Sequence, residues 1–562
     1  MNPEMRVGAP AASTGGGPVD PSAGDALARI VGEAEPTGDR PLGELIDRLA
    51  AEGRLRAIVR DGNAVEPASL GVIAIRGVAD DSRLVRPGDV FAAVPGEHAD
   101  GHDHATEAIR AGAGALIVER PIAGTEGIQL VVERSAAALA SAAAWWYGDP
   151  SHDLAVVGVT GTDGKTTTTF LVASALDAAG IQAGLVGTVE TRVGPVRART
   201  ADHVTTPGAL RLQRLLRAMV TAGDRAAVVE TTSHGLAAER VGGVAYDAAI
   251  LTNLSHEHLE YHRTFEAYRA AKLSLFERLG EGRPRKPDER PRLGVVNLDD
   301  PSAALFAEAT RAAGARLVTY GLERHADVRA NAIDERPGGL RIGIVAPGWT
   351  DPLALSLAGR FNVHNALAAV ALGVGWGLDP AAVRAGLEAV PGVPGRMERV
   401  ERGQPFGVVV DYAHSPAALE TVLDLLRPRA DAAGGGLIAV FGSAGERDVE
   451  KRPMMGRIAG ERCRLVVVTD EDPRGEPSAT IDDAIAAGAE AAGRRRGEDL
   501  LVVADRSAAI AAAFERARPG DVVLLAGKGH EPTIIGPDGP QPWDERAAAE
   551  RALAELGYEE PG

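Results

Sequence analysis

The stretch from Val159 to Thr168 combines the residue types that bind phosphate. Gly161 and Gly164 let backbone N–H groups close around phosphate oxygens, and the helical pattern that follows places a helix N-terminus beside the anion. Lys165 can reach terminal phosphates, and the hydroxyl of Thr166 can ligate Mg²⁺. The strict phosphate-loop pattern begins with a glycine, where this chain has valine. We therefore predict a variant nucleotide-binding loop rather than a plain turn rich in glycine and threonine.

Two further clusters could supply ligands to a metal at the same site. Glu230 follows the apolar run 226–229, and a Mg²⁺ held by Thr166 needs a second anionic oxygen from a neighbouring strand end. Capping of the next helix is the alternative role for Glu230. Histidine and glutamate are dense from His256 to His262, where zinc would prefer a tighter set with cysteine and magnesium suits one histidine among carboxylates and phosphates. Lys272, taken alone, is a surface lysine on a helix.

The elements that position these clusters form three α/β regions. Apolar runs of strand length alternate with helical patterns, which predicts parallel sheets covered by helices on both faces. We expect a disordered tail at 1–37 and domains at 38–152, 153–394 and 395–562. The predicted strands are 70–75, 90–94, 115–118, 128–132, 155–159, 226–229, 248–251, 293–296, 407–410, 437–441, 465–468, 500–503 and 522–525.

Composition and charge exclude several other classes of protein. The 562 residues carry a formal net charge of −18, which gives no electrostatic support for nucleic-acid binding. No run approaches the roughly 18 to 20 apolar residues of a membrane span. The single cysteine, Cys463, excludes an intramolecular disulfide and fits a reducing cytosol, and we do not assign it as a catalytic thiol. We expect a cytoplasmic monomer that acts on small molecules.

Motifs along the chain resemble those of the Mur ligase family, ATP-dependent ligases that build the stem peptide of peptidoglycan. The resemblance runs from about Leu42 to the C-terminus. Each block alone is weak, but ten in this order are specific. Within the family the likeness is greatest to the ligases that add the third residue, usually meso-diaminopimelate or lysine, to UDP-MurNAc-L-Ala-D-Glu. The blocks are 81–83, 87–91, 160–168, 205–207, 233–236, 252–255, 359–362, 395–398, 411–414 and 527–531.

The resemblance implies an N-terminal UDP-MurNAc-binding domain, a central ATPase domain of the P-loop type with a parallel sheet, and a C-terminal Rossmann-like domain that binds the amino acid. It implies two Mg²⁺ ions, the first held by Thr166 and Glu230. Lys272 matches a lysine that is carbamylated to ligate the second, together with His258; Lys165 completes the catalytic set. The nucleotide-binding positions are Gly161, Thr162, Asp163, Gly164, Lys165, Thr166, Thr167, Asn362, Arg396, Asp411 and His414; those for UDP-MurNAc-dipeptide are Ser82, Thr205, Thr206, Thr232 and Arg240.

The implied mechanism follows from charge. The D-Glu carboxylate must attack the γ-phosphate of ATP, so two anions have to be brought together; Lys165 and the two Mg²⁺ neutralise the phosphate oxygens. An acyl phosphate forms, and the incoming amine then displaces phosphate. No Ser–His or Cys–His nucleophile is needed, and closure of the third domain is expected to assemble the site.

The identity of the added amino acid depends on the loop Glu471-Asp472-Pro473-Arg474. The diaminopimelate signature is Asp-Asn-Pro-Arg, and the kept arginine suits the extra carboxylate of diaminopimelate. Asp472 replaces a neutral amide with an anion, which could favour the ammonium of lysine or ornithine. Arg447, Gly527 and Glu531 match the other pocket positions. We expect diaminopimelate; a folylpolyglutamate synthase-like ligase and a non-catalytic nucleotide-binding homologue stay open as rival functions.

Overall fold

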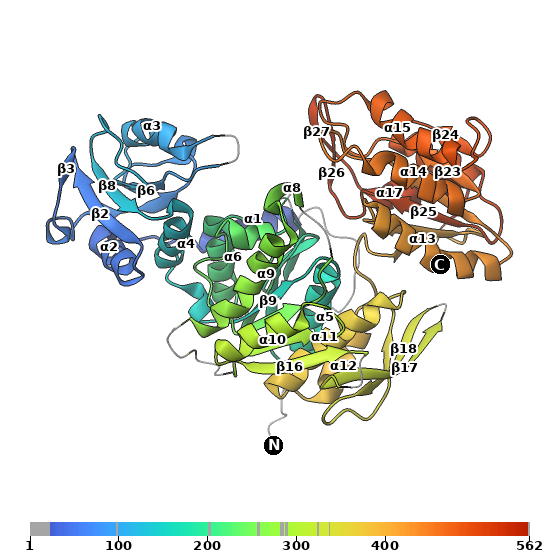
Figure 1. Cartoon of the computed structure of the whole chain (residues 1–562), viewed down its shortest axis with the longest axis horizontal. Coiled ribbons are helices and arrows are strands. Elements are labelled where there is room, and N and C mark those ends of the chain that lie inside the picture. Colours follow the sequence, from blue (N-terminus) through green and yellow to red (C-terminus); the bar gives the residue numbers. More distant parts are fainter. Residues whose placement is uncertain are drawn as a thin grey trace, which may run out of the picture.

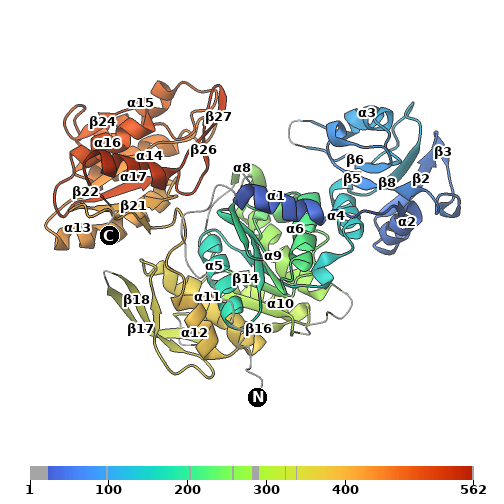
Figure 2. The ribbon, with the colours of Figure 1, turned by 180° about the vertical axis from the view of Figure 1, so that it is seen from behind.

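In the computed structural model the chain folds into three α/β lobes, each built on its own sheet (Figure 1). Seen from behind in Figure 2, the N-terminal and C-terminal lobes lie on opposite sides of the central lobe. The described residues are 23–96, 99–200, 204–255, 259–281, 286, 290–322, 325–336 and 338–559. Within these ranges, no helix combines the length and the apolar character needed to cross a bilayer.

The N-terminal lobe has a sheet of order β3-β2-β8-β7-β6-β5, in which the run from β5 to β8 is parallel. Its helices pack apolar side chains on the sheet, among them Leu45, Leu49 and Trp145. The predicted strand at 70–75 is wrong except for its last two residues, because Pro67 starts a 3-10 turn just before it. The elements are β1 (Arg40–Pro41), α2 (Leu42–Ala51), β2 (Leu55–Arg60), β3 (Asn63–Ala64), β4 (Ala74–Ile75), β5 (Gly77–Ala79), β6 (Asp89–Ala92), α3 (Ala105–Arg110), β7 (Ala115–Val118), β8 (Ile128–Val132) and α4 (Ser135–Trp146).

The central lobe has a sheet of order β12-β11-β10-β13-β9-β14-β15-β16-β17-β18-β19. Its middle strands, β10 to β17 in this order, are parallel. The predicted strands among them, β13, β9, β14 and β15, are buried along their whole length, as their unbroken apolar runs predict, whereas β10, β16 and β17 were not predicted. Helices α5, α11 and α12 cover one face, and α6, α9 and α10 cover the other. The antiparallel edges were not predicted, since polar side chains interrupt their strands.

The elements of this lobe are β9 (Ala155–Thr160), α5 (Lys165–Ala178), β10 (Ala183–Val186), β11 (Glu190–Val193), β12 (Val196–Arg199), α6 (Ala209–Thr221), β13 (Ala226–Glu230), α7 (Ser233–Ala237), β14 (Ala248–Leu251), α8 (Leu259–His262), α9 (Phe265–Glu277), β15 (Leu293–Asn297), α10 (Ala303–Ala312), β16 (Arg316–Gly321), β17 (Val328–Arg336), β18 (Gly339–Val345), β19 (Leu353–Leu355), α11 (Phe361–Trp376) and α12 (Pro380–Glu388).

The C-terminal lobe has a sheet of order β20-β21-β25-β22-β23-β24, parallel except for β20. Helices α13, α14 and α15 pack on one face, and α16 and α17 on the other. A short hairpin, β26–β27, stands beside this sheet. The elements are β20 (Glu398–Arg399), β21 (Gly407–Asp411), α13 (Pro416–Ala432), β22 (Leu437–Phe441), α14 (Lys451–Arg462), β23 (Leu465–Val468), α15 (Ser478–Ala491), β24 (Leu500–Val502), α16 (Arg506–Glu515), β25 (Val522–Ala526), β26 (Thr533–Gly536), β27 (Gly539–Pro542) and α17 (Glu545–Glu555).

The prediction of a disordered tail at 1–37 is wrong for residues 23–33. Residues Ala23–Glu33 form helix α1, which packs against β12 and α6 of the central lobe. Leu27, Ile30 and Val31 lie against the apolar core of the central lobe. The stability of this helix therefore comes from tertiary packing and not from its own sequence. Residues 1–22 lie outside the described part of the chain.

The close packing of α14 on α15 gives a test of the C-terminal lobe. A Cβ on Gly456 would lie 1.8 Å from the carbonyl oxygen of Ile485. Gly456→Ala should therefore push the helices apart and destabilise the lobe by about 1–3 kcal/mol, which lowers the midpoint of thermal unfolding. Gly32→Ala in α1 is the matched control, because a Cβ there meets nothing within 4 Å. An unchanged midpoint for Gly456→Ala would contradict the helix packing.

Candidate active site

The predicted phosphate loop lies between β9 and α5 at the carboxyl edge of the central sheet. Gly161 has a φ of 148° and Gly164 a φ of 78°, values that favour glycine. A Cβ on Gly161 would lie only 1.8 Å from the hydroxyl of Thr252, so no other residue fits here. The ammonium of Lys165 donates to the carbonyl oxygens of Gly161 at 3.0 Å and Thr162 at 2.6 Å. The lysine thus lies over the loop in which it was predicted to bind phosphate.

The end of the neighbouring strand β14 holds this loop in shape. Thr252 donates its hydroxyl to the carbonyl of Asp163 at 2.6 Å. Asn253 accepts the N–H of Asp163 on its side-chain oxygen at 3.0 Å and the N–H of Thr162 on its carbonyl at 2.7 Å. Thr252 and Asn253 were not predicted as site residues. The sequence feature that could have identified them is their position directly after β14, a strand that pairs with β9.

Lys272 is not the surface lysine that the sequence alone suggested. Its side chain is buried, its ammonium donates to the carbonyl of Gly161 at 2.7 Å, and it lies 4.6 Å from the ring centre of Tyr268. The hydroxyl of Tyr268 in turn lies 2.8 Å from that of Thr162. Lys165 and Lys272 therefore approach the same carbonyl from two helices. Their convergence concentrates positive charge where phosphate oxygens are expected.

The predicted histidine cluster is only partly described. His258 lies outside the described residues. The ring of His262 packs 5.5 Å from that of Tyr268 and 5.4 Å from that of His234. Across the residues that the structure describes, no group of three or more His, Cys, Asp or Glu side chains could hold a metal.

Glu230 ends β13 beside the phosphate loop, since its partner on the adjacent strand is Val159. One carboxylate oxygen accepts the hydroxyl of Thr188 at 2.6 Å and also its N–H. The other oxygen is buried and has no hydrogen-bond partner among the described residues. Thr232, rather than Glu230, caps helix α7, so the alternative role as a helix cap is wrong. A buried, orphaned carboxylate oxygen at this place fits a hard cation such as Mg²⁺.

The positions implied for UDP-MurNAc-dipeptide gather next to Glu230, with one exception. The hydroxyl of Thr206 donates to the carbonyl of Glu230 at 2.8 Å and lies 3.0 Å from that of Thr232. Arg240 donates to the carbonyl of Thr206 at 3.0 Å, and the hydroxyl of Thr205 lies 2.8 Å from that of Thr188. Ser82 is on the N-terminal lobe, where it donates to Glu107 at 3.1 Å.

Asn362, one of the implied nucleotide-binding positions, is connected to the phosphate loop through Asn365, which was not predicted as a site residue. Asn365, one turn further along α11, donates to the side-chain oxygen of Asn362 at 2.8 Å and accepts the hydroxyl of Thr168 at 3.2 Å. A Cβ on Gly164 would lie 2.3 Å from the Asn365 oxygen. Asn362 and Asn365 are three residues apart and so share one face of the helix, and this spacing could have identified Asn365 from the sequence.

The remaining nucleotide positions cluster in the C-terminal lobe, where β20 leads into β21. Asp411 accepts the N–H groups of Met397 and Ala413, each at 2.8 Å. Burial raises the pKa of Asp411, and the charge of Arg396 works against that rise. The guanidinium of Arg396 lies 4.6 Å from the ring centre of Tyr412, and His414 contacts the Tyr412 carbonyl at 2.9 Å. The structure therefore brings Arg396, Asp411 and His414 together.

The loop 471–474 and the loop 527–531 meet at the carboxyl ends of β23 and β25. Lys528 is buried, and its ammonium donates to Asp472 at 2.7 Å and to Glu531 at 2.6 Å. Asp472 also accepts the N–H of Ile535 at 2.9 Å. Lys528 was not predicted as a site residue, yet its ammonium lies between two of the pocket carboxylates, Asp472 and Glu531. It gives Asp472, which replaces the signature asparagine, a cationic partner that is shared with Glu531.

Arg474 has a φ of 56°, and its Nε is buried without a hydrogen-bond partner among the described residues. The backbone N–H of Arg474 donates to the carbonyl of Ile535 at 2.8 Å. The loop that carries Arg447 docks on this segment, since the N–H of Gly445 donates to the Asp472 carbonyl at 2.9 Å; Arg447 itself is exposed. Burial raises the pKa of Glu471, opposed by Lys451 and Lys528. The pocket thus offers one unsatisfied guanidinium N–H and a buried carboxyl.

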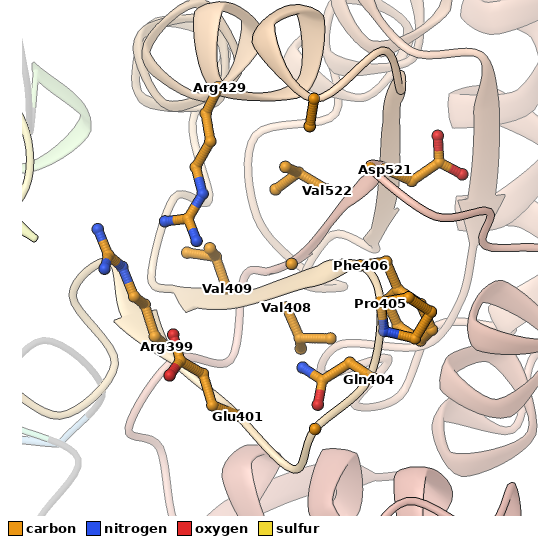
Figure 3. A pocket seen from close by; sticks show the side chains of 14 residues that line it. Arg399, Glu401, Gln404, Pro405, Phe406, Val408, Val409, Arg429, Asp521 and Val522 are labelled. Carbon is orange, nitrogen blue, oxygen red and sulfur yellow. The ribbon is translucent and has the colours of Figure 1, made fainter. Parts of the chain in front are cut away.

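Two other features lie away from this chemistry. Cys463 is buried at the end of α14, and burial raises the pKa of its thiol to about 12, which excludes a reactive thiolate at neutral pH. A cavity of about 420 Å³, shown in Figure 3, is lined by Arg399, Arg429 and apolar residues including Val409 and Val522. It lies at the amino ends of β21 and β25, opposite the pocket loops. No predicted site residue lines it.

The fold and the site together define an α/β enzyme with a nucleotide phosphate loop on one lobe and a polar pocket on another. Family models match the chain in three places: "Mur ligase family, catalytic domain" at 74–147, "Mur ligase middle domain" at 159–373 and "Mur ligase, glutamate ligase domain" at 395–529. The chain belongs to the Mur ligase family, and it is an ATP-dependent ligase of that type.

Individual relatives match over nearly their full length. The chain is 48% identical to a UDP-N-acetylmuramyl-tripeptide synthetase of Roseiflexus sp. (strain RS-1), over 90% of this chain and 99% of that protein. It is 40% identical to a UDP-N-acetylmuramoyl-L-alanyl-D-glutamate--2,6-diaminopimelate ligase of Geobacter metallireducens, over 91% and 100%. A solved structure of a ligase with the same name shares 29% identity, with a TM-score of 0.60, over 87% of this chain and 96% of that one.

Replacement of Glu230 tests the cation site. Glu230→Gln keeps the shape and the contacts with Thr188 but removes the negative charge, so the Mg²⁺ concentration for half-maximal ATP turnover should rise about tenfold or more. The midpoint of thermal unfolding should stay near that of the unaltered protein. Glu190→Gln, at a buried carboxylate on β11, the strand next to the edge of the sheet, is the control and should leave the Mg²⁺ requirement unchanged. Equal Mg²⁺ requirements for both variants would contradict the cation site at Glu230.

Proposed function

We propose that this protein adds meso-diaminopimelate to UDP-MurNAc-L-Ala-D-Glu at the expense of ATP, in the synthesis of a peptidoglycan precursor. The observation that carries the proposal is the convergence of Lys165, Lys272 and the orphaned carboxylate of Glu230 around one phosphate loop. The names of the relatives, which specify UDP-MurNAc-tripeptide synthesis, support the same reaction.

The chemistry begins with two anions that repel each other, the D-Glu carboxylate and the γ-phosphate. The ammonium group of Lys165 points toward the loop where the phosphates would lie, and together with two Mg²⁺ ions it would lower that repulsion. The carboxylate oxygen attacks phosphorus, the bond to the β-phosphate oxygen breaks, and ADP leaves an acyl phosphate. The amine of the amino acid then attacks the acyl carbon and displaces inorganic phosphate. The site needs no protein nucleophile for either step.

Two Mg²⁺ ions belong to the proposal. Thr166 and Glu230 would hold the first, and its chemistry would be to neutralise phosphate oxygens. For the second we propose His258 and Lys272, the latter as a carbamate. The buried position of the Lys272 side chain supports this modification, because carbamylation would replace a buried cation with an oxygen ligand.

The threonine cluster next to Glu230 supports the placement of the acceptor. Thr206, Thr232 and Arg240 are linked by hydrogen bonds at the carbonyl of Glu230, and Thr205 is linked to its carboxylate through Thr188, so a peptide bound there would present its carboxylate beside the phosphate loop. We assign the sugar nucleotide end to the N-terminal lobe, with Ser82 as one contact. Asn362 and the group formed by Arg396, Asp411 and His414 would hold the rest of the ATP.

The amino acid is the finer part of the proposal. Arg474 has a buried Nε without a partner among the described residues, and a guanidinium in that state suits the second carboxylate of diaminopimelate. The argument for lysine or ornithine was the negative charge of Asp472. That carboxylate already pairs with the buried ammonium of Lys528 at 2.7 Å, so it has a cationic partner without an ammonium from the substrate. Diaminopimelate is therefore favoured over lysine and ornithine.

A folylpolyglutamate synthase-like ligase and a non-catalytic homologue receive less support. The first does not account for relatives that span nine-tenths of the chain and are named for UDP-MurNAc peptides. A non-catalytic role does not explain why a buried Glu230 carboxylate oxygen without a partner among the described residues lies beside two converging lysines. We further propose that the protein works in the cytoplasm as a monomer.

Release of inorganic phosphate tests the proposed reaction. With ATP, Mg²⁺ and UDP-MurNAc-L-Ala-D-Glu present, meso-diaminopimelate should stimulate release more than L-lysine or L-ornithine at equal concentration. Stimulation by lysine alone would overturn the choice of amino acid, and no stimulation by any of the three would overturn the ligase.

A variant separates recognition of the second carboxylate from general damage. Arg474→Ala should raise the KM for meso-diaminopimelate about tenfold to a hundredfold, the value of a lost hydrogen bond to a charged group, and leave the KM for ATP unchanged. Arg457→Ala, at an exposed arginine on α14, is the control and should change neither. If Arg474→Ala left the KM for meso-diaminopimelate unchanged, the pairing of Arg474 with that carboxylate would be wrong.

A further inference from the structure

A buried ion pair lies directly beneath the amino-acid pocket. Arg506, the first residue of α16, is 1% exposed on its side chain, and Glu545, the first residue of α17, is 0% exposed. The pair is bidentate: Nε donates to one carboxylate oxygen at 2.8 Å and Nη2 to the other at 2.7 Å. Neither the sequence motifs nor the proposed chemistry assigns these two residues a role.

The remaining N–H groups of Arg506 hold two backbone carbonyls. Nη1 donates to the carbonyl of Asp470 at 3.1 Å, and Nη2 donates to that of Ala526 at 2.7 Å. Asp470 directly precedes the pocket loop 471–474, and Ala526 directly precedes the loop 527–531. One planar guanidinium therefore fixes the points at which both loops leave the sheet.

Glu545 adds a third segment to the same network. Its carboxylate accepts the indole N–H of Trp543 at 2.6 Å, and the backbone N–H of Trp543 donates to the carbonyl of Pro532 at 2.8 Å. Pro532 follows Glu531, a pocket position, and leads into the hairpin β26–β27. That hairpin contacts Asp472 and Arg474 through the backbone of Ile535.

The energetics favour a rigid network. Burial by itself would lower the pKa of Arg506, but the charge of Glu545 and the hydrogen bonds to it outweigh burial and raise that pKa. Since no water replaces a lost donor at a buried site, removal of the guanidinium would leave two carbonyls without this donor and the Glu545 carboxylate without its counter-ion. A planar fork with five donors can hold all three acceptors at fixed angles, which an ammonium cannot.

We propose that Arg506, held by Glu545, is a positioning residue that sets the spacing of the two pocket loops and thereby the fit of the third amino acid. The proposal rests on the proposed function of these loops. Arg506 does not contact the substrate; it acts through Asp470 and Ala526 on the segments that carry Arg474 and Glu531. A shift of about 1 Å in such a support is enough to cost a large part of the binding.

The test uses the full-length protein with the double variant Arg506→Met, Glu545→Leu. An apolar pair of similar volume replaces a buried ion pair without leaving an unpaired charge, so the fold should survive. We expect the KM for meso-diaminopimelate to rise at least tenfold, the KM for ATP to change less than twofold, and the midpoint of thermal unfolding to stay within a few degrees. Arg506→Lys, which keeps the charge but not the fork, should give a smaller rise in the KM for meso-diaminopimelate.

Arg464→Met is the matched control in the same lobe. Arg464 pairs with the buried Asp521, near the amino ends of the strands and away from the pocket. Its loss should lower the unfolding midpoint and leave the KM for meso-diaminopimelate unchanged. If the double variant instead raised all the KM values together with a lower midpoint, or left the KM for the amino acid unchanged, the positioning role would be overturned.

Hydrogen exchange keeps this test separate from the proposed reaction. In the double variant, amide exchange should become at least tenfold faster in both 471–474 and 527–531, and stay unchanged in the phosphate loop 161–166. This outcome is expected even if no amino acid stimulates phosphate release, a result that would overturn only the proposed function. Unchanged exchange in either pocket loop would overturn the role of Arg506.

Discussion

The close approach of two strand ends at Gly161 is the constraint on which the site depends. Its backbone adopts a φ open to glycine, and Thr252 stands where a Cβ would be. Only this approach lets β14 supply the hydrogen bonds that shape the loop, and only an unobstructed carbonyl can receive the ammonium groups of both Lys165 and Lys272. The parallel sheet beneath provides the register, because β13, β9 and β14 end side by side.

The central and C-terminal lobes differ in how their buried charged side chains are paired. At the phosphate loop, cations converge and a single carboxylate oxygen is left without a partner among the described residues, which suits a reaction between two anions. In the C-terminal lobe, at and beneath the pocket that we propose for the amino acid, buried cations are paired: Lys528 with Asp472 and Glu531, and Arg506 with Glu545. Buried pairs of this kind add little stability, and their value lies in fixed geometry.

The sequence predicted much of this arrangement because the relevant residues follow apolar runs. The strands β9, β13, β14 and β25 were found from such runs, and parallel strands place the residues after them at one edge. The antiparallel strands β11 and β12 and the helix α1 were missed, since their stability comes from neighbours rather than from their own pattern. The composition of the tail, which is rich in small residues, does not predict that Leu27 and Ile30 pack on an apolar surface.

The sequence indicated candidate binding residues, but it did not indicate the residues that hold them in place. Lys165 and Glu230 are recognisable from their neighbours in the sequence, whereas the burial of Lys272 follows from the packing of α9 against β9. Asn253, Asn365 and Lys528 hold predicted residues in place by contacts between distant segments, and no local pattern encodes such contacts. The significance of Asp472 also changed for this reason, because its partner lies 56 residues away.

The central claim is that the cations at the phosphate loop promote attack of a substrate carboxylate on phosphorus. Transfer of oxygen tests this directly. With UDP-MurNAc-L-Ala-D-Glu labelled with ¹⁸O in the reacting carboxylate, the inorganic phosphate released during ligation should carry one ¹⁸O atom from the substrate. Phosphate free of the label would show that no acyl phosphate forms and would contradict the account.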